Sequence, residues 1–138
     1  MQEKMPNILC VDDSEDFLRM VKVLLARRGF RVFTATSGAA ALKLFQKSTC
    51  HVAIIDYMMP GMKGGELAQK LRERDPQLHI ILHTGYADIE DPLLDNVDCT
   101  IPKGSFSFLL NKLNELVAEQ VKEINPARRR ARAKRSAA

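Results

Sequence analysis

Five short apolar runs recur along the chain, each bounded by polar or turn-forming residues. Short continuous apolar runs, separated by longer stretches of a different pattern, are typical of strands that are buried on both faces. We therefore predict strands at Asn7–Val11, Arg31–Ala35, His51–Ile55, His79–Leu82 and Cys99–Ile101.

The stretches between and after these runs carry apolar residues at helical spacing. Ser14, Ser37 and Ser105 stand just before three such stretches, where a serine side chain can accept a hydrogen bond from the helix N-terminus. Gly29 and Pro76 stand where two of the helices should end. The apolar stripes contain Phe17, Leu18, Val21, Leu24 and Leu25, then Leu42 and Phe45, then Leu67, Ala68 and Leu71, and finally Phe106, Leu109, Leu110, Leu113, Leu116, Val117 and Val121.

The stretch Asp88–Asn96 differs from these helices because it contains Pro92. A proline removes a backbone hydrogen bond and clashes with the preceding turn, so we expect at most a short or irregular fourth helix there. Strands that alternate with helices predict an α/β domain with a parallel sheet covered on both faces. We assign this domain to residues 5–124 and expect residues 125–138 to form a basic, disordered tail.

The formal net charge of +4 comes from the tail. Residues 128–135 contribute six basic side chains, and without them 15 basic residues face 17 acidic ones. The predicted domain is therefore mildly acidic, which gives no basic face for nucleic acid. The tail alone offers phosphate-binding charge, but it has no aromatic residue and no recognition motif, so a solvated tail is the simpler interpretation.

No run approaches the roughly 18 apolar residues that a membrane span needs. The start of the chain lacks a basic region followed by an apolar stretch, so we expect no signal peptide, no membrane partner and a cytoplasmic location. Cys10, Cys50 and Cys99 are odd in number and widely spaced, which indicates buried, reduced thiols. The three histidines show no metal-ligand spacing, and we give them no catalytic role.

Polar side chains stand just beyond the ends of the predicted strands. Asp12 and Asp13 follow the first strand, Asp56 the third and Lys103 the fifth, while Thr84 closes the fourth. In open parallel sheets, ligands bind beyond the carboxyl ends where the strand order reverses, and in a flavodoxin-like order this point lies between the first and third strands. We therefore expect the two groups of aspartates to flank a binding crevice.

Three converging carboxylates repel one another, so a cation or a lysine is needed beside them. Because cysteine and histidine show no ligand spacing, the expected ion is one that prefers oxygen, such as Mg²⁺, which also binds phosphate oxygens. A carboxylate is also a nucleophile toward phosphorus, and Asp56, Lys103 and Thr84 fit the roles of nucleophile, cation and hydroxyl. Each residue alone has an ordinary structural explanation, and only their joint position favours a site.

Four segments carry these residues in order along the chain: LCVDDSED, VAIIDYMMPGMKGGEL, ILHTGYAD and IPKGSF. They resemble the signature segments of the receiver domain of bacterial two-component response regulators, over about Asn7 to Glu123. The resemblance implies a flavodoxin-like, doubly wound five-stranded parallel sheet with strand order 2-1-3-4-5. It also implies that Asp56 accepts a phosphoryl group from a sensor histidine kinase or a histidine phosphotransfer protein, and that the domain then switches to control an output.

The resemblance further assigns roles to single residues. Lys103 would hold the phosphoryl oxygens, and Thr84 would switch toward them. The domain would be no enzyme in the usual sense, since it would catalyse only its own phosphorylation and dephosphorylation. The Mg²⁺ would be bound directly by Asp13, Asp56 and the backbone carbonyl of Met58, and largely through water by Asp12.

The sequence departs from the family pattern at three places. Many members have proline after the lysine, whereas here Pro102 precedes Lys103 and Gly104 follows it. Because cis peptide bonds are nearly confined to bonds before proline, a cis bond after Lys103 is not expected. Thr100 replaces the aromatic residue common three places before the lysine, so another element is expected to carry the output. The interval between Thr84 and Lys103 is also short, which leaves little room for the fourth helix.

Met58 bears on two further predictions. An alternative function is a Mg²⁺-dependent phosphatase with an aspartyl nucleophile, which needs an acid/base aspartate two places after the nucleophile. Met58 occupies that place after Asp56, so this alternative ranks well below the receiver domain. Met58 and Tyr86 also occupy the positions that border the path of water to the aspartyl phosphate in the family. Because a methionine cannot orient water and a tyrosine ring is bulky, we predict slow intrinsic dephosphorylation.

Overall fold

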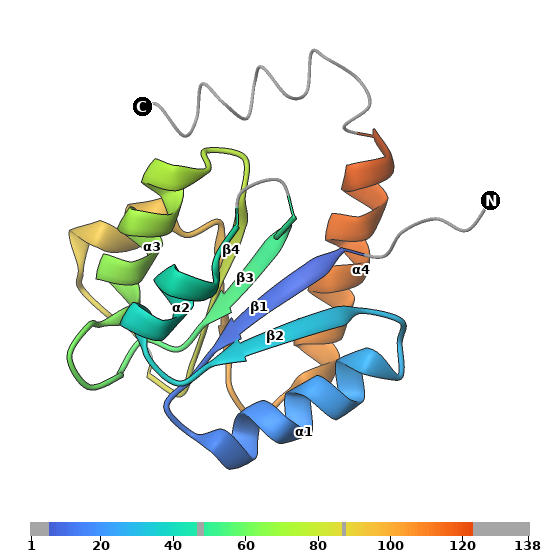
Figure 1. The fold of residues 1–138 in the computed structure, drawn as a ribbon, viewed down its shortest axis with the longest axis horizontal. Coiled ribbons are helices and arrows are strands. Elements are labelled where there is room, and N and C mark those ends of the chain that lie inside the picture. Colours follow the sequence, from blue (N-terminus) through green and yellow to red (C-terminus); the bar gives the residue numbers. More distant parts are fainter. Residues whose placement is uncertain (1–5, 47–48, 87, 123–138) are drawn as a thin grey trace.

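The computed structural model describes residues 6–46, 49–86 and 88–122, so the predicted tail and the side chain of Val121 lie outside the described residues. Within these ranges, a five-stranded parallel sheet has the order β2-β1-β3-β4-β5 (Figure 1). This is the flavodoxin-like order that the resemblance implies. None of the helices in these ranges has the length and hydrophobicity needed to cross a membrane.

Strands and helices alternate along the chain as predicted, with small differences at strand ends. The fourth strand runs on to Thr84 because its ladder with the fifth strand continues, with Thr84 in register with Pro102. The third strand begins at Val52, one residue later than predicted. In chain order the elements are β1 (Asn7–Val11), α1 (Glu15–Ala26), β2 (Arg31–Ala35), α2 (Gly38–Leu44), β3 (Val52–Ile55), α3 (Gly64–Arg74), β4 (His79–Thr84), η1 (Pro92–Asn96), β5 (Cys99–Pro102) and α4 (Phe106–Lys122).

Two of the three predicted helix caps are confirmed. The side chains of Ser14 and Ser37 each accept a hydrogen bond from the backbone N–H three residues on, at 3.2 and 3.1 Å. The hydroxyl of Ser105 lies 3.1 Å from that of Ser107, and its role as a cap stays a prediction. Helix α1 ends at Ala26, before Gly29.

The fourth helical element is short, as Pro92 predicted. It is a single 3₁₀ helix, η1, and Pro92 is its first residue, where a missing N–H costs little. The segment packs against α3. Every peptide bond in the described part of the chain is trans, including the bond after Lys103.

The sheet has a separate apolar core on each face, because successive strand residues point to opposite sides. In β1, Ile8 and Cys10 join the core under α1 and α4, while Leu9 and Val11 join the core under α2 and α3 (Figure 1). The thiols are free, and burial, followed by the charge of Asp12, raises the pKa of Cys10 to about 12. With both faces covered by apolar packing, two of the buried carboxylates, Asp12 and Asp56, lie together at the carboxyl edge of the sheet.

Candidate phosphoryl and metal site

The ends of β1 and β3 bring the predicted aspartates together. The backbone ladder continues one residue past each strand, since the Asp12 N–H donates to the Ala35 carbonyl (3.2 Å) and the Asp56 N–H donates to the Val11 carbonyl (2.9 Å). Carboxylate oxygens of Asp12, Asp13 and Asp56 lie within 4.8 Å of one another. Asp12 and Asp56 are buried and Asp13 is exposed, so the cluster is open to solvent on one side.

Lys103 brings a positive charge to this cluster from the end of β5. Its backbone N–H donates to the Thr84 carbonyl (2.9 Å), and its Nζ lies 2.6 Å from Asp12 Oδ2 and 3.4 Å from Asp56 Oδ2. Burial lowers the pKa of Lys103, but its hydrogen bond to Asp12 and the charges of both aspartates outweigh burial and raise it. The lysine is therefore protonated and bridges the two buried carboxylates.

The two oxygens of Asp56 have different partners. The Tyr57 N–H donates to Oδ1 (2.9 Å), and Lys103 faces Oδ2. Burial and then the charge of Asp12 raise the pKa of Asp56, although Lys103 and the Tyr57 N–H act in the opposite direction. One lysine does not balance the carboxylates, and a divalent cation beside them would remove this imbalance.

The groups present fit Mg²⁺. Among the described residues, the cluster consists of three aspartates and includes no cysteine or histidine. Carboxylate oxygens at one open edge suit a small hard cation that keeps several waters and binds phosphate oxygens. Met58 follows the cluster closely in the chain, and the metal-binding role of its carbonyl stays a prediction.

An open cleft of about 710 Å³ gives access to these groups. Two of its lining side chains are well exposed, Met58 at 42% and Tyr86 at 59%. They are the two side chains predicted to border the path of water. Asp13, Asp56 and Lys103 also line the cleft, so the buried carboxylate can be reached from solvent.

Thr84 lies beside this cleft and does not line it. The residue is 1% exposed and lines a neighbouring pocket of about 370 Å³, together with Leu82, Leu94 and Thr100. Its hydroxyl accepts a hydrogen bond from the Tyr86 N–H (3.2 Å). The predicted switch of this hydroxyl toward a phosphoryl group stays a prediction.

Sequence reasoning missed two aromatic neighbours of the lysine. The Phe17 ring lies 4.7 Å from Lys103 Nζ, within the range of a cation–π contact. The buried His83 ring lies 5.5 Å from the Phe17 ring, and burial, followed by the charge of Lys103, lowers the pKa of His83 to about 4. His83 is therefore neutral near pH 7. The available signals were the position of Phe17 one helical turn after Asp13 and that of His83 directly before Thr84.

Comparison with known proteins agrees with this geometry. A family model for the response regulator receiver domain matches residues 8–98. Among curated proteins, the chain is similar to the transcriptional regulatory protein AfsQ1 of Streptomyces coelicolor, with 37% identity over 84 residues, which are 61% of this chain and 37% of that protein. The chain spans less than half the length of the curated relatives it matches.

Solved structures show the same fold. A CheY-like receiver domain protein from Methanospirillum hungatei has a TM-score of 0.79 and 31% identity, covering 86% of this chain and 98% of that chain. The response regulator TrrA of Thermotoga maritima, solved in complex with Mg²⁺ and BeF, has a TM-score of 0.74 and 34% identity, covering 81% and 99%. TrrA has also been solved in complex with the histidine kinase ThkA, with a TM-score of 0.74 and 32% identity over 81% and 98% of the two chains.

Proposed function

Because the chain belongs to the family of response regulator receiver domains, we propose that Asp56 is its phosphoacceptor and Mg²⁺ its cofactor. The donor is a sensor histidine kinase or a histidine phosphotransfer protein, in keeping with the complex of the similar TrrA with a histidine kinase. The observation that carries the proposal is the environment of the Asp56 carboxylate. It has Lys103 on one oxygen, the Tyr57 N–H on the other and an open cleft beside it.

In the transfer, a carboxylate oxygen of Asp56 attacks phosphorus as the bond from phosphorus to the imidazole nitrogen of the donor breaks. The electron pair of that bond stays on the nitrogen, and an acyl phosphate forms on Asp56. Lys103 offers its ammonium to the phosphoryl oxygens from its position beside Asp12 and Asp56. Asp13, Asp56 and the Met58 carbonyl would hold Mg²⁺ directly and Asp12 would hold it largely through water, and the ion would supply further positive charge to the transfer.

After transfer, the Thr84 hydroxyl turns toward the phosphoryl oxygens and leaves its hydrogen bond with the Tyr86 N–H. This movement starts the conformational change that an output domain or partner detects. The catalytic role of the chain is limited to its own phosphorylation and dephosphorylation.

The phosphoacceptor is tested by mass spectrometry after treatment with acetyl phosphate, with and without Mg²⁺. We expect one added phosphoryl group on the wild type and none on Asp56→Asn. Asp95→Asn, an exposed position in η1, is a matched control that should label fully. Equal labelling of Asp56→Asn, or labelling that a chelator does not reduce, would refute the assignment.

The metal ligands are tested by titrating Mg²⁺ in the presence of beryllofluoride, a phosphoryl mimic. Asp13→Ala should weaken binding more than Asp12→Ala, because Asp13 is assigned to the ion directly and Asp12 largely through water. The reverse order would show that the roles of the two aspartates are exchanged.

A further inference from the structure

Tyr57 connects the end of β3 to a segment 34 residues further along the chain. The residue is 9% exposed, its backbone N–H donates to Asp56 Oδ1 (2.9 Å), and its hydroxyl donates to Asp91 Oδ2 (2.8 Å). A phenol keeps its proton near pH 7, so the hydroxyl is the donor in this bond. One residue thus contacts both the phosphoacceptor carboxylate and the loop before η1.

Asp91 is the N-cap residue of η1, directly before Pro92. Its Oδ1 accepts a hydrogen bond from the Leu93 N–H (3.0 Å), and its carbonyl accepts one from the Leu94 N–H (3.0 Å). The carboxylate therefore joins the first turn of η1 to Tyr57. Gly65, in the first turn of α3, allows this approach, because a Cβ there would lie 2.6 Å from Asp91 Oδ2.

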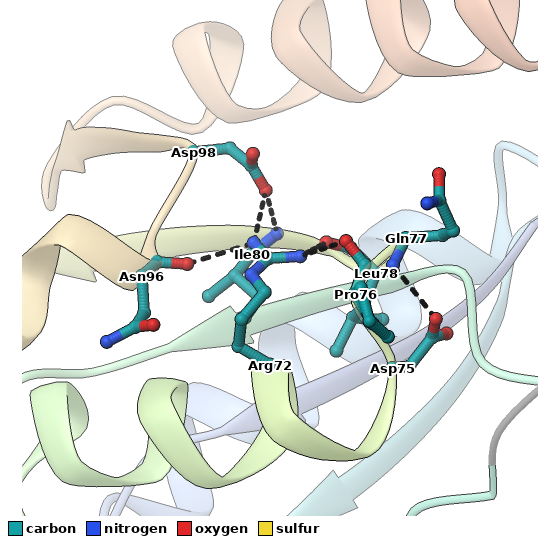
Figure 2. Close-up of polar contacts among 8 residues, drawn as sticks. All are labelled: Arg72, Asp75, Pro76, Gln77, Leu78, Ile80, Asn96 and Asp98. Atoms are coloured by element: carbon teal, nitrogen blue, oxygen red, sulfur yellow. Dashed lines mark hydrogen bonds and ion pairs between the residues drawn. The ribbon is translucent and has the colours of Figure 1, made fainter. Parts of the chain in front are cut away.

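The other end of η1 is held independently, by Arg72 of α3. Figure 2 shows the guanidinium reaching the Asn96 carbonyl (2.9 Å) and the Asp98 carboxylate (3.0 Å). Asp98 Oδ2 also accepts a hydrogen bond from the Ile80 N–H (2.7 Å), which ties this end of the segment to β4. The first turn of η1 depends on Tyr57, whereas its end depends on Arg72.

We propose that the Tyr57–Asp91 hydrogen bond couples the state of Asp56 to the first turn of η1, and that loading of the site weakens this bond and loosens that turn. The proposal rests on the proposed function, in which the Asp56 carboxylate and the Met58 carbonyl would both bind the metal ion. Because the Tyr57 N–H donates to Asp56 Oδ1, a shift of this carboxylate on loading would move the backbone of Tyr57 and with it the ring. The unloaded bond has near-ideal length, and displacement of the ring therefore weakens it.

The probe is Mg²⁺ with beryllofluoride, and the readout is amide hydrogen exchange followed by NMR. In the wild type, loading should speed exchange of the Leu93 and Leu94 amides by about fivefold, at the low end of usual coupling between sites. The Asp98 amide, which donates to the Ile80 carbonyl (2.8 Å) at the Arg72 end, should not change. Unchanged or slower exchange at Leu93 and Leu94 would overturn the proposal.

Tyr57→Phe removes only the hydroxyl, so it tests whether the coupling depends on the hydrogen bond to Asp91. In this variant, exchange of the Leu93 and Leu94 amides should no longer respond to loading. Because loading then breaks no Tyr57–Asp91 hydrogen bond, the variant should bind the probe about fivefold more tightly than the wild type. Asp91→Ala should also bind the probe more tightly than the wild type, whereas the control Asp95→Ala should bind it as the wild type does. These two variants test the coupling even if Tyr57→Phe does not fold. Unchanged or weaker binding by the folded variants would overturn the coupling.

Different results would refute the proposed function and the coupling. If the wild type does not bind the probe, or Asp56→Asn binds it equally well, the proposed function is wrong. If binding is normal and depends on Asp56, but Leu93 and Leu94 do not respond, only the coupling is wrong.

Discussion

Arg72 and Lys103 each bring a positive charge into the folded chain, but their surroundings differ. Arg72 is 9% exposed and donates to the carbonyls of Pro76, Leu78 and Asn96 as well as to the Asp98 carboxylate (Figure 2). Lys103 faces a cluster with three carboxylates, where the pKa of Asp56 is raised by burial and by Asp12.

The difference separates a buried cation whose surroundings compensate its charge from one that faces an excess of negative charge. At Arg72 a single cation meets one carboxylate and several backbone oxygens, so its burial is compensated and the network links α3 to the segment after η1. At Lys103 negative charge is in excess and one side is open, which costs stability until a cation arrives. Variants of the two clusters should therefore shift stability in opposite directions.

The largest change in stability is expected from Arg72→Met. It leaves the carbonyls of Pro76, Leu78 and Asn96 without their charged donor, so the free energy of unfolding should fall by about 3 kcal/mol in a urea titration. Asp56 should still be labelled by acetyl phosphate while the variant is folded.

Arg74→Met is the matched control on the same helix. Arg74 is exposed and donates to the Leu42 carbonyl (2.7 Å), so its loss should cost less than about 1 kcal/mol. Equal effects of the two substitutions would show that the Arg72 network has no special structural role.

The next largest effect concerns the lifetime of the phosphoryl group. Met58→Asn combined with Tyr86→Glu places polar side chains along the cleft, and loss of the phosphoryl group after donor removal should become about tenfold faster, which corresponds to about 1.4 kcal/mol of barrier. A double variant that keeps its phosphoryl group as long as the wild type would disprove water exclusion by these two side chains.

A smaller effect is expected on the pH dependence of stability. Folding raises the pKa of Asp56, so the folded state binds a proton on this carboxyl more readily than the unfolded state does. The protonated carboxyl therefore stabilises the fold at low pH. This contribution is lost as pH rises from 3.8 through the raised pKa. Above that range, Asp56→Asn should therefore be more stable than the wild type. The two stabilities should converge as pH falls below 3.8 in urea titrations, and a gap that persists there would contradict this cause.

The smallest effect is expected from truncation after Asn125. The removed residues show no apolar periodicity, so the melting temperature and the labelling of Asp56 should stay unchanged. A clear fall in melting temperature would show that the tail packs against the domain.

Local patterns were sufficient to predict the strands and which polar residues gather at the carboxyl edge of the sheet. The buried run that ends at Ile55 predicts a strand, and Asp56 directly after it predicts chemistry at the carboxyl edge, because the strand direction determines where that residue lies. Pro92 likewise predicts the short η1, because the effect of a proline on a helix is local.

The long-range polar contacts were not predictable in this way. In the segment LRERDP, Arg72 has the pattern of a surface charge near a helix end, and its partners Asn96 and Asp98 lie 24 and 26 residues away. Tyr57 and Asp91 lie 34 residues apart, and no motif in the sequence links them. The Thr84 hydroxyl was assigned to the right strand end, but its bond to the Tyr86 N–H depends on the conformation of the following loop.

Helix α3 begins with Gly64 and Gly65, although glycine is roughly 1 kcal/mol less favourable than alanine inside a helix. A Cβ at Gly64 would lie 2.5 Å from the Asp56 carbonyl oxygen, and one at Gly65 would lie 2.6 Å from Asp91 Oδ2. In evolutionary terms, substitution by any residue with a Cβ should be selected against at both positions, for different reasons. A methyl group at Gly64 would press on the backbone of Asp56, and one at Gly65 would press on Asp91, the partner of Tyr57. The mutational tolerance of this domain is thus restricted at two residues that carry no side chain at all.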